Sequence, residues 1–208
     1  MKSKICGIST TDILKYITSH LYPPEFIGFI CNYKKSKRFI KLNELKELLK
    51  IEKKNSKYVS VLVKPKKKIL EEISVLPFDY YQIYDMEPNE IDFIKKKYNK
   101  KIIVALTIDK KSDVDKYKNY LGIADLFLFD SKGYEKSLSF DHSYLNTIPK
   151  NLNIMIAGNF KPEDDFKSYQ SYSDYIDVSG GVENKKGVKD KEKINHFLLN
   201  IKKTNNEN

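Results

Sequence analysis

The feature that most constrains the fold is a repeated alternation of short apolar segments with amphipathic ones. The apolar segments are residues 3–8, 26–31, 58–63, 79–84, 101–108, 124–130, 153–157 and 175–179. Strands that alternate with helices form parallel sheets, and eight such units favour a closed barrel over an open sheet, which more often has five or six strands. We therefore predict an α/β fold, a single-domain (β/α)8 TIM barrel over residues 1–202, with a disordered tail at residues 203–208.

Helix starts are predicted where capping residues follow an apolar segment. Thr10, Thr11 and Asp12 predict a helix over residues 13–19, and a second helix is expected over residues 112–120. Pro162, followed by two acidic residues, predicts another helix start after the seventh apolar segment.

Length and composition describe one globular domain in a reducing compartment. A chain of 208 residues can bury one sizeable core. No segment approaches the run of roughly 18 apolar residues that a membrane helix needs, and the N-terminus lacks the pattern of a secretory signal. Cys6 and Cys31 are too few for a disulfide framework. We expect a cytoplasmic protein with two free thiols and no contact with membranes.

The formal charge of +10 raises the question of a nucleic-acid partner. The lysines are spread over all the expected helices and do not cluster, which favours a solvated helical surface. We expect no nucleic-acid partner, with a basic nucleic-acid-binding module as the alternative.

Polar residues and glycines stand where several of the predicted strands end. Cys6 lies near the end of the first strand and Asp130 ends the sixth. Gly158-Asn159 follows the seventh strand and Ser179-Gly180-Gly181 follows the eighth, at the places where barrels commonly bind phosphate. A thiol facing a carboxyl group suggests proton transfer. Each residue also has a structural interpretation: Cys6 as a small buried hydrophobe, Asp130 as a helix cap or ion-pair partner, the glycines as turns.

A series of short motifs runs through nearly the whole chain. They are Lys4-Ile5-Cys6-Gly7-Ile8 with Asp12, Gly28-Phe29-Ile30, Lys35-Ser36-Lys37-Arg38, Gln82 after Asp79, Phe129-Asp130-Ser131, Phe140-Asp141, Ala157-Gly158, Asp177-Val178-Ser179-Gly180-Gly181-Val182-Glu183, and Gly187-Val188-Lys189-Asp190. In these motifs and their order the chain resembles the phosphoribosylanthranilate isomerase family. The opening Lys-Ile-Cys-Gly and the closing Asp-Val-Ser-x-Gly-Val-Glu are specific when they occur together.

The resemblance implies a (β/α)8 barrel that carries out an Amadori rearrangement in tryptophan biosynthesis, converting N-(5-phosphoribosyl)anthranilate to the carboxyphenylamino-deoxyribulose phosphate. It implies Cys6 as general base, Asp130 as general acid and Arg38 as the group that holds the anthranilate carboxylate. The remaining substrate-binding residues that it implies are Gln82, Gly158, Asn159, Asp177, Ser179 and Gly180. No metal or cofactor is required, and the expected partner is a phosphorylated small molecule bound by a monomer or homodimer.

The implied chemistry places demands on both catalytic groups. Opening the ribose ring requires a protonated Asp130, and burial would raise the pKa of that carboxyl group in the needed direction. Removing the C2 proton requires Cys6 as a thiolate, which needs nearby positive charge. Lys4, two residues earlier on the same strand face, is a candidate for that charge. A buried lysine paired with a structural carboxylate is the alternative interpretation of Lys4.

Three loops depart from the family pattern. Residues 133–139 replace the usual Gly-Gly-Thr-Gly-Lys type of loop, and Gln82-Ile83-Tyr84-Asp85 replaces Gln-Leu-His-Gly. Asn159 stands in place of a second glycine. These departures keep open the alternative of a diverged barrel that binds a sugar phosphate with altered or lost turnover.

Overall fold

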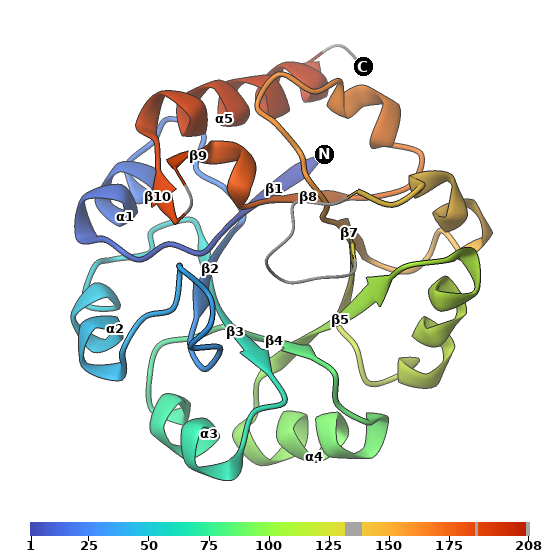
Figure 1. Cartoon of the computed structure of the whole chain (residues 1–208), viewed down its shortest axis with the longest axis horizontal. Helices are drawn as coiled ribbons and strands as arrows, with labels where there is room; N and C mark the ends of the chain where they lie inside the picture. Colours follow the sequence, from blue (N-terminus) through green and yellow to red (C-terminus); the bar gives the residue numbers. More distant parts are fainter. Residues whose placement is uncertain (132–138, 186, 207–208) are drawn as a thin grey trace.

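The predicted barrel is confirmed by a computed structural model, which describes residues 1–131, 139–185 and 187–206. Eight parallel strands close in chain order, with β1 paired to β8 (Figure 1). The strands are β1 (Lys2–Cys6), β2 (Phe26–Ile30), β3 (Lys57–Val63), β4 (Tyr80–Tyr84), β5 (Lys101–Ile108), β6 (Leu126–Ser131), β7 (Ile154–Ile156) and β8 (Tyr175–Val178). Each lies within one residue of a predicted segment or inside it.

Helices and turns surround the strands as an outer ring (Figure 1). The α-helices are α1 (Thr11–Thr18), α2 (Leu42–Leu48), α3 (Lys67–Ser74), α4 (Pro88–Tyr98) and α5 (Lys191–Asn206). The 3-10 segments are η1 (Lys111–Tyr120), η2 (His142–Thr147), η3 (Phe166–Tyr169) and η4 (Gly180–Val182). A short hairpin of β9 (Glu183–Lys185) and β10 (Val188–Lys189) follows β8. No helix in the described part of the chain is long and apolar enough to cross a membrane.

The alternation of side chains along each strand divides the core into two layers. On β5, Ile102 and Val104 pack outward against the helices, whereas Ile103 and Ala105 point into the barrel. Both sets are buried, which explains why the strands are continuous apolar segments and not alternating ones. Cys6 belongs to the inner layer and Ile5 to the outer one, so the first strand presents its thiol to the barrel interior.

Local sequence signals account for the best-defined helix ends. Pro88 opens α4, and Glu87 and Glu90 form a reciprocal capping box at its start. The helix predicted over residues 13–19 is α1, shifted toward the N-terminus. The helix predicted over residues 112–120 is the 3-10 segment η1.

The helix start predicted at Pro162 is wrong. Residues 162–164 form a turn, and only the single 3-10 turn η3 follows. The side-chain amide of Asn200 on α5 donates to the carbonyl groups of Pro162 and Asp164. These two carbonyls would accept the first hydrogen bonds of a helix at this place, so the contact with α5 replaces the helix.

The predicted disordered tail is wrong for residues 203–206, because α5 continues through Asn206. Thr204 is buried, and the side chain of Asn205 bonds to both the amino group and the carbonyl of Met1. Packing against the start of β1 thus extends the helix beyond its apolar pattern. Residues 207–208 of the predicted tail lie outside the described residues.

Candidate active site

The predicted acid and base both face the barrel interior at the carboxyl ends of their strands. Cys6 is the last residue of β1, and Asp130 follows Leu126 and Leu128, whose side chains lie inside the barrel. Because side chains alternate along a strand, Asp130 continues this inward row. The two residues come from strands that β7 and β8 separate in the closed barrel, and both lie at the end where active sites of this architecture are found.

Asp130 is held by a hydrogen bond from β4. The Tyr84 hydroxyl donates to Oδ2 of Asp130 at 3.0 Å. Burial, reinforced by the charge of Asp177, raises the pKa of Asp130 to about 6, although Tyr84, the backbone at Ser131 and Lys4 oppose the shift. The expectation that burial would raise this pKa is confirmed. A carboxyl group in this range can donate or accept a proton near neutral pH.

Cys6 is a buried thiol with charged neighbours. Burial raises its pKa, and Lys4 is the largest influence in the opposite direction, acting through both its charge and a hydrogen bond. Asp177 adds to the rise and Lys189 opposes it. The interior therefore favours the thiol, and the ammonium groups are what make a thiolate accessible.

Lys4 pairs with Asp177 inside the barrel. Its Nζ lies 2.6 Å from Oδ2 of Asp177, on the adjacent strand and at the same register. Burial alone would lower the pKa of Lys4, but Asp177 and Cys6 outweigh burial and raise it, so the ammonium is charged. Lys4 thus serves both interpretations given above: it has a carboxylate partner and it acts on the thiol. Asp177, predicted to bind substrate, influences the pKa of both Cys6 and Asp130.

Tyr84 is a residue of the candidate site that sequence reasoning missed. The Gln82 side-chain amide donates to the Tyr84 hydroxyl at 3.1 Å, and that hydroxyl donates to Asp130. Burial raises the pKa of Tyr84 well above its usual range, and Asp130, Cys6 and Asp177 raise it further. The thiol and both carboxyl groups therefore act on one hydroxyl, which places them around a common space. In the sequence this position registers only as a departure from a family motif.

Arg38 lies beside the base. Its side chain packs over Gly7, directly after Cys6, where the backbone is left-handed (φ +78°) and a Cβ would collide with the arginine. Glu183 accepts from Nε and Nη2 of Arg38 at 2.6 and 2.9 Å, and Lys189 donates to the same carboxylate at 2.7 Å. Burial would raise the pKa of Glu183, but these two cations lower it to about 2.

Glu183 and Lys189 belong to the motifs that carry the family resemblance, but nothing in their spacing predicts that they meet. The β9–β10 hairpin brings them together, and Lys189 also donates to the carbonyl of Ser179. Burial lowers the pKa of Lys189 to about 8 even though Glu183 opposes the shift. The predicted substrate residue Arg38 is therefore held by a buried carboxylate that the sequence did not single out.

The two loops predicted to bind phosphate converge. A Cβ on Gly181 would collide with the carbonyl oxygen of Phe160, so the loops after β7 and β8 are in backbone contact. Gly158 and Asn159 both have positive φ, 125° and 52°. The Ser179 hydroxyl donates to the carbonyl of Cys6, which ties this region to the base. Gly180 begins the short η4 turn. All four predicted phosphate residues thus lie at the same end of the barrel as Cys6.

The departure noted after the sixth strand falls mostly outside the described residues. Residues 132–138 are not described, and Ser139 is an exposed residue that follows them. Among the described residues, no group of three or more histidine, cysteine, aspartate or glutamate side chains is arranged to hold a metal ion.

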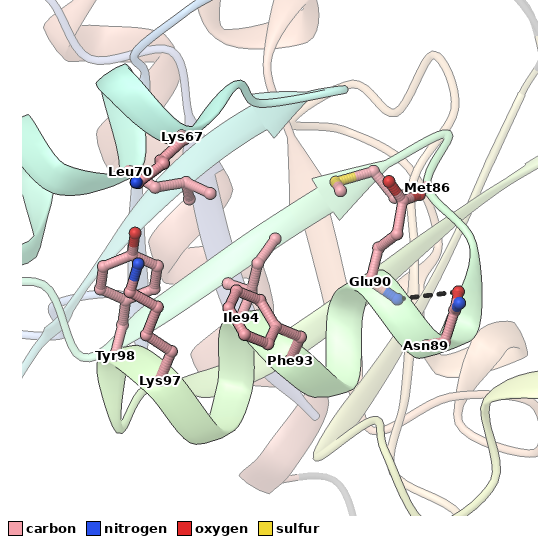
Figure 2. Close-up of a pocket in the computed structure, with 9 residues that line it drawn as sticks. All are labelled: Lys67, Leu70, Met86, Asn89, Glu90, Phe93, Ile94, Lys97 and Tyr98. Carbon is pink, nitrogen blue, oxygen red and sulfur yellow. Dashed lines mark hydrogen bonds between the residues drawn. The ribbon is translucent and has the colours of Figure 1, made fainter.

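A separate groove lies on the outside of the barrel between α3 and α4 (Figure 2). Its volume is about 490 Å³, and Leu70, Phe93 and Ile94 line it together with Lys67 and Lys97. It is built from helix side chains and Met86, and contains none of the predicted site residues. The candidate active site is therefore the inner cluster at the strand ends and not this groove.

Comparison with known proteins gives a consistent result. The family model for N-(5'-phosphoribosyl)anthranilate (PRA) isomerase matches residues 3–200. The chain is 32% identical to the N-(5'-phosphoribosyl)anthranilate isomerase of Rhizobium johnstonii, over 97% of this chain and 94% of that protein. It is 31% identical to the enzyme of the same name from Rhizobium rhizogenes, over 94% and 91%. The crystal structure of phosphoribosyl anthranilate isomerase from Thermotoga maritima superposes with a TM-score of 0.84 at 26% identity, covering 98% and 99% of the two chains.

Proposed function

The chain belongs to the N-(5'-phosphoribosyl)anthranilate isomerase family, an enzyme family of tryptophan biosynthesis, and from this premise we propose how its residues carry the reaction. The substrate is N-(5-phosphoribosyl)anthranilate and the product is 1-(2-carboxyphenylamino)-1-deoxyribulose 5-phosphate. In our proposal Asp130 is the general acid and Cys6 the general base.

Two charged ends of the substrate orient it between these groups. The phosphate binds at the converging loops, where Gly158, Asn159, Ser179 and Gly180 lie. The anthranilate carboxylate binds Arg38, which stands beside Gly7. Glu183 accepts from Nε and Nη2 of that guanidinium and so fixes its orientation beside Cys6. Gln82 and Asp177 line the space between the two ends.

The reaction begins with two proton transfers between the substrate and these residues. Asp130 gives its proton to the ribose ring oxygen, the C1–O bond breaks, and the anthranilate nitrogen supplies the electron pair that forms the C1=N bond. The resulting iminium acidifies the C2 proton. The Cys6 thiolate takes that proton, the C2 electrons form an enamine, and tautomerisation of the enamine yields the ketone product.

The pKa values determine how the pair shares its protons. Because the pKa of Asp130 is about 6 and burial raises that of Cys6, the two groups together hold one proton across the neutral range. The shared proton resides mainly on the sulfur of Cys6. In the form that reacts, the proton is on Asp130 and Cys6 is a thiolate. Lys4 reduces the cost of reaching the working form, since it stabilises the thiolate.

The observation that carries the proposal is that Cys6 and Asp130 both face the barrel interior at the carboxyl ends of their strands. The test is turnover of phosphoribosylanthranilate by the purified protein, followed by the change in substrate fluorescence. We expect Cys6→Ala and Asp130→Asn each to lower kcat by at least about 100-fold while the protein stays folded. Full activity in either variant would reject the assignment.

Cys31→Ala is the matched control for the cysteine variant. Cys31 is also buried, but its thiol donates to the carbonyl of Phe29 in the outer core, and burial raises its pKa to about 12. We expect this variant to lose stability and keep its kcat. Phosphate binding without turnover by the unmodified protein would favour the alternative of a diverged sugar-phosphate-binding barrel.

We also propose a monomer or homodimer that works in the cytoplasm. A structure of phosphoribosylanthranilate isomerase from Thermotoga maritima is described as a monomeric form of a dimeric enzyme, and its chain shares the fold at a TM-score of 0.82. Sedimentation of the purified protein over a range of concentrations tests the oligomeric state.

A further inference from the structure

The strongest unexplained feature of the site is a row of three polar side chains that links Gln82, Tyr84 and Asp130 across the barrel interior. Gln82 is fully buried and Tyr84 nearly so. Gln82 Nε2 lies 3.1 Å from the Tyr84 hydroxyl oxygen, which lies 3.0 Å from Oδ2 of Asp130. A buried polar row is costly unless its members are paired, so its position against the acid calls for an explanation.

The order of donation along this row follows from the chemistry of the groups. A phenol has a single proton to donate. Since the Gln82 amide already donates to the hydroxyl oxygen, the phenol proton is directed toward Asp130. The phenol also stays protonated, because burial and the neighbouring acids raise the pKa of Tyr84 well above its usual range. Asp130 therefore has a permanent neutral donor.

We propose that Tyr84 is a positioning residue for the general acid: its hydroxyl, fixed by Gln82, orients the Asp130 carboxyl group and stabilises the carboxylate left when the proton has been given to substrate. This inference rests on the proposed function, in which Asp130 protonates the ring oxygen. A donor to the charged form makes the group a stronger acid than burial alone would allow.

The other groups around Asp130 have separable effects. Asp177 on β8 disfavours its ionised form, whereas Lys4 on β1 and the backbone at Ser131 favour it. Cys6 acts on Tyr84 from β1. Tyr84→Phe leaves these groups in place and removes the hydroxyl, which also accepts from Gln82, so a change in the titration of Asp130 reports the loss of that hydroxyl.

The test compares Tyr84→Phe with Tyr80→Phe. Tyr80 lies on the same strand and the same inner face, four residues earlier, where its ring packs against Phe26 and lies near Lys101. The Asp130 carboxyl group is titrated by NMR of protein labelled with 13C-aspartate, and Asp130→Asn identifies its resonance. The pH dependence of kcat/KM is measured on the same proteins.

In Tyr84→Phe we expect the Asp130 midpoint to rise by roughly one pH unit, the value of one hydrogen bond to a charged group. The midpoint of the acidic limb of the kcat/KM profile should move to higher pH by the same amount, because that limb reports the first proton lost by the acid–base pair. In Tyr80→Phe neither should move. An unchanged or lower Asp130 midpoint in a folded Tyr84→Phe protein overturns the proposal.

If circular dichroism shows that Tyr84→Phe does not fold, Gln82→Leu provides a second variant. It removes the amide that fixes the phenol and should raise the Asp130 midpoint by a smaller amount; no shift overturns the proposal. The titration does not depend on turnover. An unmodified protein that fails to convert phosphoribosylanthranilate therefore rejects the proposed function, while the Asp130 midpoint still decides whether Tyr84 acts on this carboxyl group.

Discussion

Replacing Lys4 by methionine separates the structural and electrostatic roles of the ion pair inside the barrel. Methionine is similar in length to lysine but has no charge, so Lys4→Met leaves the Asp177 carboxylate buried without its partner at 2.6 Å. Removing one member of a fully buried pair costs about 3–5 kcal/mol. A domain is typically stable by only about 5–15 kcal/mol, so Lys4→Met should lose a large part of its free energy of unfolding.

A double variant identifies the cause of that loss. Lys4→Met combined with Asp177→Leu replaces both charges by apolar groups, and such replacements are often neutral or stabilising. We therefore expect the double variant to recover most of the free energy of unfolding, measured by urea denaturation. If it is as unstable as Lys4→Met alone, the loss does not come from an uncompensated carboxylate and the reasoning is wrong.

The same double variant should fold without recovering activity. Lys4 lowers the pKa of Cys6 through charge and a hydrogen bond, and Asp177 raises it less strongly. Losing both should leave a net rise in the pKa of Cys6, which makes the thiolate scarcer at pH 7. We expect kcat/KM to fall by at least about tenfold at pH 7 and to recover partly as the pH is raised. A folded double variant with full activity at pH 7 would refute the role of Lys4 in supporting the base.

Three further predictions concern other parts of the site. In the unmodified protein kcat/KM should rise with pH through about 6, where Asp130 ionises and the pair loses its first proton, and should decline at alkaline pH as Cys6 loses the second. Glu183→Gln should cost roughly 2–3 kcal/mol of stability at pH 7, since a carboxyl pKa lowered to about 2 gives stability that is present above about pH 4.5 and is lost as the pH falls toward 2; urea denaturation at pH 7 and pH 3 measures the difference. Asn159→Gly should keep both activity and melting temperature, whereas Asn159→Val should lose about 1–2 kcal/mol at its φ of 52°, which thermal unfolding will detect.

The barrel could be predicted from the sequence because its strands are buried on both sides. A parallel strand covered by helices outside and by side chains inside must be apolar throughout, so every strand stands out from the polar loops. Asp130 could be assigned to the site on the same basis. It ends the apolar segment 124–130, whose other charged residue, Asp125, lies near the beginning. Its inward direction then follows from alternation with Leu126 and Leu128.

Contacts between segments far apart in the chain were not predictable in this way. The Asn200 side chain donates to the carbonyls of Pro162 and Asp164, where a helix was predicted to begin. No sequence pattern around Pro162 indicates this contact. The end of α5 is likewise fixed by Asn205 bonding to Met1. In both prediction errors an asparagine side chain of α5 bonds to the backbone of a segment far away in the sequence.

Asn159 shows how a departure from a motif can preserve the geometry that the motif supplies. Glycine is favoured there because the chain needs a positive φ after Gly158. Asparagine is among the residues that best tolerate the left-handed region, and Asn159 adopts it at φ 52°. The sequence difference therefore does not imply that the backbone has moved away from the place proposed for phosphate.

Lys4 illustrates a different limit of sequence reasoning, since its two interpretations were set against each other and the structure supports both. An ammonium group has three N–H donors and can serve more than one acceptor. Lys4 donates to Asp177, and its charge also opposes the rise in the pKa of Cys6, so the ammonium that pairs with the buried carboxylate is also the one that favours the thiolate. A closed barrel makes β1 and β8 neighbours, and the register then places Lys4 beside Asp177. The Lys4–Asp177 pair could therefore have been predicted from the fold. The influence of the same ammonium group on the Cys6 thiol could be seen only in the structure.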